Sequence, residues 1–238
     1  MRRSFFVTHF ILIGGMNMTE FLIALLTIIV IDLVLAGDNA IVIGLAARKL
    51  PKEQQKKVII WGTVGAIVLR MILTGVVVYL LEISGLRLVA GLVLVYIAYK
   101  LMVDDGGHGD VKAGKSMLAA IQTIIVADTV MGLDNVLAVA SAAHGDMLLV
   151  ILGLVISVPI MVWGSTLILK WIERFPAIIY IGSAVLAWTA VKMMVEEPVW
   201  GISDFFHEYG WIKYGLALVV MIAVVGLGYL KNKKNKKA

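Results

Sequence analysis

The chain of 238 residues has no cysteine, only four histidines and few charged side chains. Without cysteine it can form no disulfide bond, thiolate metal site or thiol nucleophile. Four histidines are a small number for a zinc or soft-metal site, so a site of that class is not expected either. Charged residues make up 16% of the chain, whereas soluble domains contain about 25%. These absences point away from an ordinary soluble domain.

Apolar side chains take the place of the missing charge. They make up 61% of the residues, and the mean hydropathy is +0.98. A soluble particle of this size cannot bury so much apolar surface, so lipid is the expected solvent. Continuous runs of Leu, Ile, Val and Ala favour helices over the alternating strands of a barrel, and we predict an all-α membrane protein with seven transmembrane helices. The predicted helices are 19–46, 58–81, 86–103, 117–143, 147–169, 176–195 and 211–230.

The basic residues orient these helices. They concentrate in the loops at 47–57 and 104–116, in the turn with Lys170 and Arg174, and in the tail after residue 230. If seven helices cross in alternation, all four places fall on one side, which the positive-inside rule assigns to the cytoplasm. The prediction is an outside amino terminus and a cytoplasmic carboxyl terminus, in the inner (cytoplasmic) membrane of a bacterial cell. The net charge of +5 then reflects loops beside lipid, and no nucleic-acid partner is expected.

A twelve-residue pattern, IIVxDxVxxxDN, occurs twice. Residues 28–39 and 124–135 share seven identical positions, three of them polar and inside predicted helices. Equivalent motif residues lie 96 positions apart, from 32 to 128, from 38 to 134 and from 39 to 135. A weaker match relates Gly62 to Gly153. Each unit contains three predicted helices, and because three is odd the second unit enters the membrane from the opposite face, as in many transporters.

This duplication divides the chain into five segments. They are an N-terminal leader at 1–18, the first three-helix repeat at 19–103, a cytoplasmic linker at 104–116, the second, inverted repeat at 117–195, and an extracytoplasmic loop, seventh helix and basic tail at 196–238. The leader begins with a basic pair and a short apolar run, as signal segments do, but shows no small-residue cleavage site. A dispensable leader, with Met16 or Met18 opening the functional protein, is the favoured interpretation.

The duplicated motif places four aspartates in the membrane interior. An aspartate at the centre of a helix costs at least about 2.5–3.5 kcal/mol to insert, so each needs a partner, a proton, water or a cation. Positions i and i+7 of a helix lie about 20° apart, so Asp32 shares a face with Asn39 and Asp128 shares one with Asn135. Unwinding at a motif glycine would free carbonyl oxygens and let the carboxylates converge.

We therefore expect an oxygen-rich site for a hard divalent cation such as Mn²⁺, Mg²⁺ or Ca²⁺. The candidate metal ligands are the polar residues of both motifs, namely Asp32, Asp38, Asn39, Asp128, Asp134 and Asn135. Two other interpretations stay open: hydrogen bonds that hold helices together, and a relay for protons alone. Arg70 interrupts the second predicted helix and needs an anion; it either pairs with a motif aspartate and changes partner as the ion passes, or has a structural pairing only.

The two motifs, LAGDN and GLDN, each preceded by IIVxD, resemble those of the TerC family of integral membrane proteins, named for tellurium resistance. The resemblance extends over about residues 19–195. It implies a short, seven-helix bacterial protein of metal homeostasis, chiefly manganese efflux, with the six motif residues along the ion path. The second motif departs from the first, because Leu133 stands at the position of Gly37 and its own glycine, Gly132, comes one position earlier. The point of helix breakage is therefore not carried over.

The expected function is that of a divalent cation transporter that exports Mn²⁺ by alternating access, with proton exchange as a candidate driving force. No enzyme activity and no permanently bound cofactor are expected. The expected partners are the metal ion, the lipid bilayer and other membrane proteins, a second copy of the chain among them. Two other functions are alternatives. An intramembrane aspartyl protease would use two carboxylates as a dyad, and an accessory or scaffold protein would use helix surfaces without the aspartates.

Overall fold

The computed structural model describes residues 18–81, 83–103, 113–143 and 146–235. Its long helices are α2 (Met18–Ala47), α3 (Lys52–Leu81), α4 (Leu86–Met102), α5 (Ala113–Ala142), α6 (Met147–Arg174), α7 (Ala177–Val195) and α9 (Gly210–Asn235). Two short helices, η1 (Val199–Gly201) and α8 (Ile202–Glu208), connect α7 to α9. No strand occurs in these ranges, so the all-α prediction is confirmed. The predicted leader up to residue 17 and most of the predicted linker lie outside the described residues.

A long helix lies at each of the seven predicted stretches. Within the described ranges, α3, α6, α7 and α9 are long and apolar enough to cross a membrane, and α2 and α5 raise the number to six if each is one bent span. The chain is thus a multi-pass membrane protein with four to six candidate spans, and α4, with 17 residues, is shorter than these.

The observed helices differ from the predicted stretches mainly at their ends. The helix α3 already begins at Lys52, because apolar residues mark only the part of a helix that lies in lipid, while the backbone hydrogen bonds continue into water. The short helices η1 and α8 were not predicted, since segments of three and seven residues with mixed polarity give no membrane signal.

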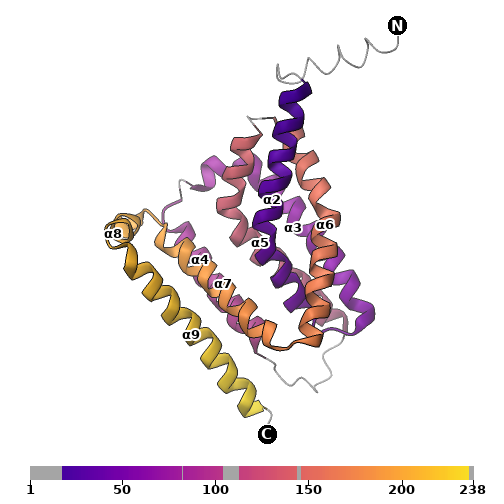
Figure 1. Ribbon diagram of the computed structural model, residues 1–238, viewed down its shortest axis with the longest axis vertical. Coiled ribbons are helices and arrows are strands. Elements are labelled where there is room, and N and C mark those ends of the chain that lie inside the picture. Colours follow the sequence, from indigo (N-terminus) through magenta and orange to yellow (C-terminus); the bar gives the residue numbers. More distant parts are fainter. Residues whose placement is uncertain (1–17, 82, 104–112, 144–145, 236–238) are drawn as a thin grey trace.

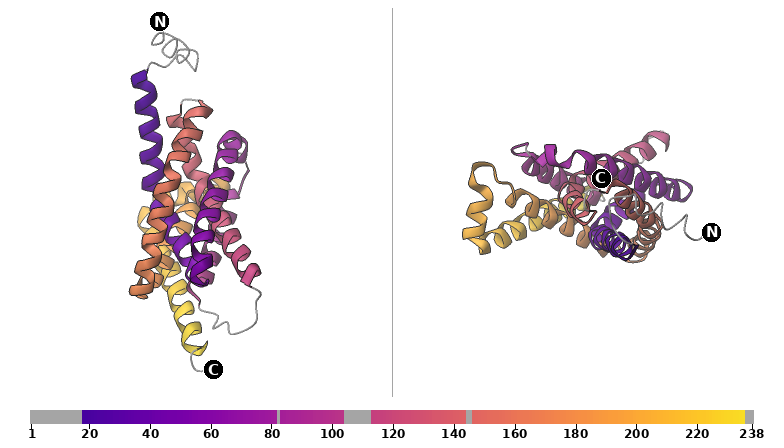
Figure 2. Two further views of the ribbon diagram at one scale, coloured as in Figure 1. Left: turned by 90° about the vertical axis from the view of Figure 1, so that its right-hand side faces the viewer. Right: turned by 90° about the horizontal axis from the view of Figure 1, so that it is seen from above.

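The helices α2, α3, α5 and α6 form one bundle, and α4, α7 and α9 lie beside it (Figure 1). In the bundle α2 packs chiefly against α6, and α3 packs chiefly against α5. Outside it α4 packs against α7, and α9 covers α7 at the edge of the molecule. The bundle helices run roughly along one direction (Figure 2). Large apolar side chains on the outer surface, such as Trp61 and Leu230, are then those that contact lipid.

Glycines allow close approaches between bundle helices, and two of these glycines lie at equivalent positions of the duplication. A Cβ atom added to Gly62 of α3 would lie 2.7 Å from Cδ1 of Ile124 on α5. A Cβ atom added to Gly153 of α6 would collide in the same way with Ile28 of α2. Gly62 is equivalent to Gly153 in the duplication, and Ile28 is equivalent to Ile124. Each repeat unit therefore places its glycine against the equivalent isoleucine of the other unit, and small residues at these points let the backbones come together.

Polar side chains close the C-terminal end of α4. Arg48, just after α2, donates to the Leu101 carbonyl at 2.9 Å, and Lys49 donates to the carbonyl of Val103. Asn232 of α9 donates to the Met102 carbonyl at 3.2 Å. Cationic groups are favourable where a helix ends, because its last carbonyls are unsatisfied and partly negative. The ends of α2, α4 and α9 thus meet at one end of the molecule.

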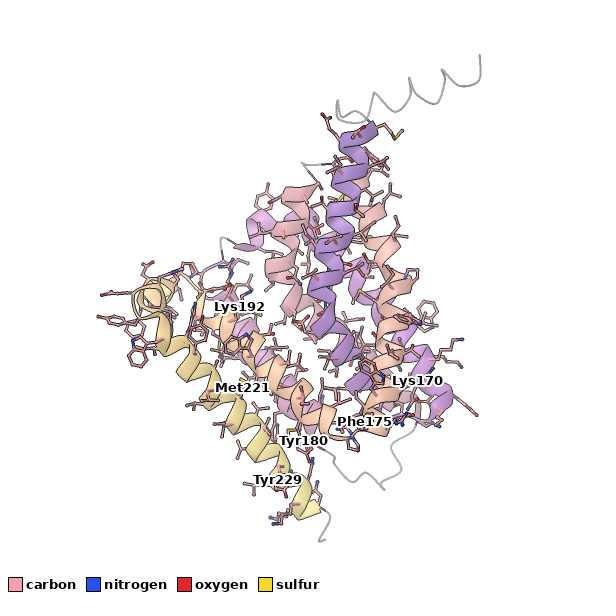
Figure 3. All side chains as sticks on the ribbon, in the orientation of Figure 1. Lys170, Phe175, Tyr180, Lys192, Met221 and Tyr229 are labelled. Atoms are coloured by element: carbon pink, nitrogen blue, oxygen red, sulfur yellow. The ribbon has the colours of Figure 1, made fainter. Side chains whose placement is uncertain are left out.

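The helix α9 is attached along the length of α7 by aromatic pairs. The rings of Tyr180 and Tyr229 lie 6.3 Å apart between centroids, and Trp188 stacks on Tyr214 at 5.8 Å. Figure 3 shows Tyr180 beside Tyr229, with Lys192 toward the other end of α7. Because these contacts occur near both ends, α9 is held against α7 rather than hinged at one point.

Glu197 joins the loop before α4 to the loop after α7. The residue is 2% exposed, and its carboxylate accepts the backbone N–H groups of Arg87 at 3.0 Å, Gly85 at 3.1 Å and Val199 at 3.2 Å. Burial alone raises the pKa of the Glu197 carboxyl, but these backbone donors outweigh it, so its pKa lies below its ordinary value. The joint fastens the start of α4 to the end of α7.

We predict that Glu197→Gln lowers the stability of the protein by about 1.5–3 kcal/mol at neutral pH, because the new NH₂ group cannot accept a backbone N–H. The lowered pKa means that the carboxylate stabilises the fold above its ordinary value of 4.5, and that this stabilisation is lost as the pH falls through the lower folded pKa. Thermal unfolding in detergent from about pH 7 to about pH 3 should therefore show the two proteins converging below pH 4.5.

The matched control is Glu196→Gln, since Glu196 enters this joint through its backbone carbonyl, which accepts from Arg87 Nη1 at 3.0 Å. It should melt close to wild type. A difference between wild type and Glu197→Gln that stays constant over the whole pH range would contradict the role of the carboxylate charge.

Candidate functional site

Both copies of the motif lie where a helix bends. The helix α2 bends by 48° between Met18–Val34 and Gly37–Ala47, and α5 bends by 62° between Met117–Leu133 and Asn135–Ala142. The assigned helices α2 and α5 run through the two bends, and each bend lies next to its motif glycine, where we considered unwinding. A Cβ atom at Gly37 would meet no atom within 4 Å, which leaves open space beside the first bend. Leu133 in the second motif does not prevent the second bend.

One arginine connects the two motifs. Arg70 of α3 donates through Nη1 to Oδ1 of Asp32 on α2, and through Nη2 to Oδ1 of Asp128 on α5. The three residues are 2%, 1% and 4% exposed. Asp32 and Asp128 are equivalent in the duplication, so the guanidinium lies between two carboxylates that occupy the same position in the two units. Pairing of this kind is what makes three buried charges tolerable inside a membrane protein.

The pairing does not satisfy the whole site. Oδ2 of Asp32, Oδ2 of Asp128 and Nε of Arg70 are buried and have no hydrogen-bond partner among the described residues. Two ionised carboxylates and one guanidinium also leave an excess of one negative charge. Buried acceptor oxygens with negative charge to spare attract a further cation, a proton or ordered water.

Asp38 and Asn39 lie just beyond the bend of α2. The Asn39 residue is 2% exposed, yet neither Nδ2 nor Oδ1 of its amide has a hydrogen-bond partner in the described part of the chain. Asp38 is half-buried, its Oδ1 accepts the Asn39 N–H at 2.9 Å, and it lies within electrostatic range of Asp128 and Arg70. A buried amide without a protein partner is rare, and its oxygen is a candidate ligand for a bound ion.

The second motif is described less completely. Asn135 is half-buried in α5 beyond the bend, and the side chain of Asp134 lies outside the described residues. Within the described residues no three His, Cys, Asp or Glu side chains form a group that could hold a metal ion. The structure thus brings Asp32 and Asp128 together, with Asp38 in range, around a cation that belongs to the protein itself.

The double role of Arg70 is the feature that sequence reasoning missed. Its position inside an apolar helix indicated a need for one anion, and either motif could provide it. A guanidinium offers donors on both sides of a planar fork, and this property is the signal that could have predicted two carboxylate partners. Which two are reached depends on α3 lying against α5 and near α2, and this arrangement is tertiary.

Comparisons with known proteins agree with the motif. Residues 17–236 match the family described as "Integral membrane protein TerC family". The chain is 42% identical over 206 residues to the uncharacterized membrane protein YjbE of Bacillus subtilis, which covers 87% of this chain and 94% of that one. It is 26% identical over 233 residues to the inner membrane protein YgdQ of Escherichia coli, covering 90% and 94%. No solved structure matches the chain significantly.

The Asn39 amide, which has no hydrogen-bond partner among the described residues, allows a test that distinguishes an ion ligand from a structural residue. Leucine has a similar size and favours helices. Asn39→Leu should therefore leave the free energy of unfolding unchanged or raise it by up to about 1–3 kcal/mol, and the melting temperature should follow. If the amide is an ion ligand, the same variant should bind Mn²⁺ at least about tenfold more weakly. Thermal melting and Mn²⁺ titration of the purified protein measure both. A large drop in melting temperature with unchanged Mn²⁺ affinity would identify Asn39 as a helix-packing residue.

Proposed function

Because the chain belongs to the TerC family of integral membrane proteins, we propose that it transports a divalent metal cation out of the cytoplasm, with Mn²⁺ as the ion. The ion passes between the two motifs while the repeat units alternate between inward-open and outward-open arrangements. The observation that supports this most directly is the pair of equivalent carboxylates, Asp32 and Asp128, directed at one buried cation where the two units meet.

Helix packing supports an inverted repeat as the basis of this motion. An operation that exchanges the units replaces α2 with α5 and α3 with α6. It exchanges the contact of α2 with α6 for that of α5 with α3, and both are principal contacts of the bundle. It also exchanges the Gly153–Ile28 contact for the Gly62–Ile124 contact. Units that pack equivalently on each other can rock between two equivalent arrangements. This motion opens the ion site first to one face of the membrane and then to the other.

We propose seven crossings, with the amino terminus outside, the carboxyl terminus in the cytoplasm, and the inner membrane as the location. The additional crossing is α4, whose 17 residues span about 26 Å, close to the hydrocarbon core of about 30 Å. The end where Arg48 and Lys49 meet the carbonyl groups of α4 becomes the cytoplasmic one, as the positive-inside rule requires. The relative YgdQ is described as an inner membrane protein, which fits this location.

The donor set fits a hard divalent ion. Carboxylate and amide oxygens are the ligands that Mn²⁺, Mg²⁺ and Ca²⁺ take. Among the described atoms, Oδ2 of Asp32, Oδ2 of Asp128 and the Asn39 amide have capacity to spare, and we propose the other motif residues as further ligands. The residues support the class of ion, and the family resemblance narrows it to manganese. Carboxylates that release a metal can take up protons, so we propose a proton gradient as the energy source.

The alternatives account for fewer of the observations. An aspartyl protease needs two carboxylates that share a proton and activate water, whereas a guanidinium lies between Asp32 and Asp128 and bonds to each. A scaffold that uses only its helix surfaces provides no reason for buried charge at the meeting point of two units, or for the partnerless Asn39 amide.

The test is metal flux into proteoliposomes that contain the purified protein, with a panel of divalent ions and with or without a pH gradient. We expect Mn²⁺ flux, and faster flux when protons can move in exchange. Asp32→Asn and Asp128→Asn each remove one carboxylate without changing size, and each should lower the rate by about tenfold or more. The matched control is Asp204→Asn, since Asp204 is an exposed aspartate on α8.

Undiminished Mn²⁺ flux in a folded variant that lacks all four motif aspartates would refute transport through this site. Cleavage of a membrane peptide by the purified protein, lost in either single aspartate variant, would support the protease instead.

A further inference from the structure

We propose that Arg70 is a tethered substitute for the transported ion. It occupies the space between Asp32 and Asp128 when the carrier is empty, leaves when the ion binds, and returns when the ion is released, so that the empty carrier can change its orientation. This inference rests on the proposed transport function and adds to it the residue that closes the cycle.

The position of the guanidinium is the first observation. It bonds to one carboxylate from each unit, and all three residues are almost completely buried. A divalent cation bound by both motifs must approach the same two carboxylates. Arg70 and the ion are therefore competitors for one place, because the guanidinium already occupies Oδ1 of both carboxylates and repels a second cation at short range.

The way in which the guanidinium is held is the second observation. Each carboxylate receives it through a single oxygen, Oδ1, and the Nε donor has no partner among the described residues. Two-point Arg–carboxylate pairs, with two parallel bonds to one carboxylate, are the geometry that holds an arginine most firmly. Gly132 of α5 lies beside Nε, since a Cβ atom added to this glycine would be in van der Waals contact with Nε at 3.7 Å. The guanidinium is thus paired at two points but left without a full set of bonds, as an exchangeable cation should be.

The third observation is that Arg70 breaks the equivalence of the units. Gly62 is equivalent to Gly153, 91 positions later, and the residue 91 positions after Arg70 is Met161. The register is supported by the next turn, where Thr74 donates to the Arg70 carbonyl at 2.8 Å and Ser165 donates to the Met161 carbonyl at 2.7 Å. Equivalent packing explains why a long side chain stands at both positions, but it does not explain why only one of them is charged. One ion site shared by two units needs only one substitute cation, and Arg70 is that cation.

The physical consequence concerns the empty carrier. Two carboxylates without a cation repel each other and resist burial, and Arg70 lowers the number of protons that the empty pair must take up from two to one, so at neutral pH a carrier without Arg70 should change orientation mainly with the ion in place. Such a carrier exchanges ions across the membrane but performs little net transport, because net transport requires the empty carrier to return. Removing the competitor should also tighten ion binding. A side chain that merely holds helices together predicts neither effect.

The experiment compares net flux with exchange in proteoliposomes at equal pH on both sides. Net flux is Mn²⁺ entry into vesicles without internal Mn²⁺, and exchange is entry of radioactive Mn²⁺ into vesicles loaded with unlabelled Mn²⁺. For Arg70→Gln we expect net flux to fall by at least about tenfold while exchange stays within about threefold of wild type. Mn²⁺ binding to the purified variant should be at least about tenfold tighter. Arg70→Lys retains a cation and should retain net flux, and Arg174→Gln, at an exposed arginine of α6, should behave as wild type.

The absence of cysteine from the chain permits a second variant, Arg70→Cys, with a unique thiol. It should behave as Arg70→Gln until it is labelled. Labelling during exchange with 2-aminoethyl methanethiosulfonate attaches an ammonium group and should restore net flux, whereas methyl methanethiosulfonate attaches a neutral group and should not. Restoration by both reagents, or by neither on a labelled protein, would overturn the proposal, because the charge would then not be what matters.

Equal loss of net flux and exchange in folded Arg70→Gln protein would also overturn the proposal and would assign Arg70 a structural role. Undiminished net flux in this variant would overturn the proposal as well. Failure of the transport proposal itself looks different, since the wild type would then show neither flux. In that case unchanged Mn²⁺ affinity of Arg70→Gln would count against the inference as well.

Discussion

The guanidinium of Arg70 bonds to a carboxylate of each repeat unit, and all three groups lie inside a bundle whose outer surface faces lipid. Neither water nor a distant counterion can replace these bonds, so the helices that bear the charges must be held in a fixed relation. The close contacts of the bundle do this. Gly62 lets α3 approach α5, Gly153 lets α6 approach α2, and Arg70, two turns from Gly62, then lies within reach of both motifs.

The scaffold and the charge have different symmetry. Packing contacts, the bent motifs and the serine or threonine bonds to the preceding turn all occur in equivalent pairs. The arginine occurs once, with Met161 at the equivalent position. In the proposed transport cycle the units adopt two equivalent arrangements, and a single cation between them is shared by both. This combination is consistent with a carrier whose two states differ in access while its central charges stay paired.

The rest of the molecule keeps the bundle in place at its ends. Glu197 holds the start of α4 against the end of α7 through the backbone N–H groups of Gly85 and Arg87, and the side chains of Arg48, Lys49 and Asn232 close the other end of α4. The helix α9 contributes little buried surface and is held by aromatic pairs along α7. None of these joints involves a side chain of the two motifs.

The sequence by itself determined the helices, the membrane setting and the identity of the polar residues. Long apolar runs admit only helices in lipid, because every backbone group must be satisfied within its own segment. The repeat at a spacing of 96 residues identified Asp32 with Asp128 and Asn39 with Asn135 without any coordinates. Helix ends were less well predicted, as at Lys52, because apolarity ends at the membrane surface and the helix does not.

Tertiary structure decided which of these residues meet. Both aspartates lie on one arginine only because α3 packs against α5 and near α2, and no local pattern around Arg70 encodes that choice of neighbours. It also decided that both motif helices bend beside their glycines, and that the Asn39 amide is buried without a described partner. The physical reason is the distance along the sequence over which each interaction acts. Hydrophobic periodicity and backbone hydrogen bonding act within a helix, whereas the pairing of buried charges depends on contacts between segments that are distant in the sequence.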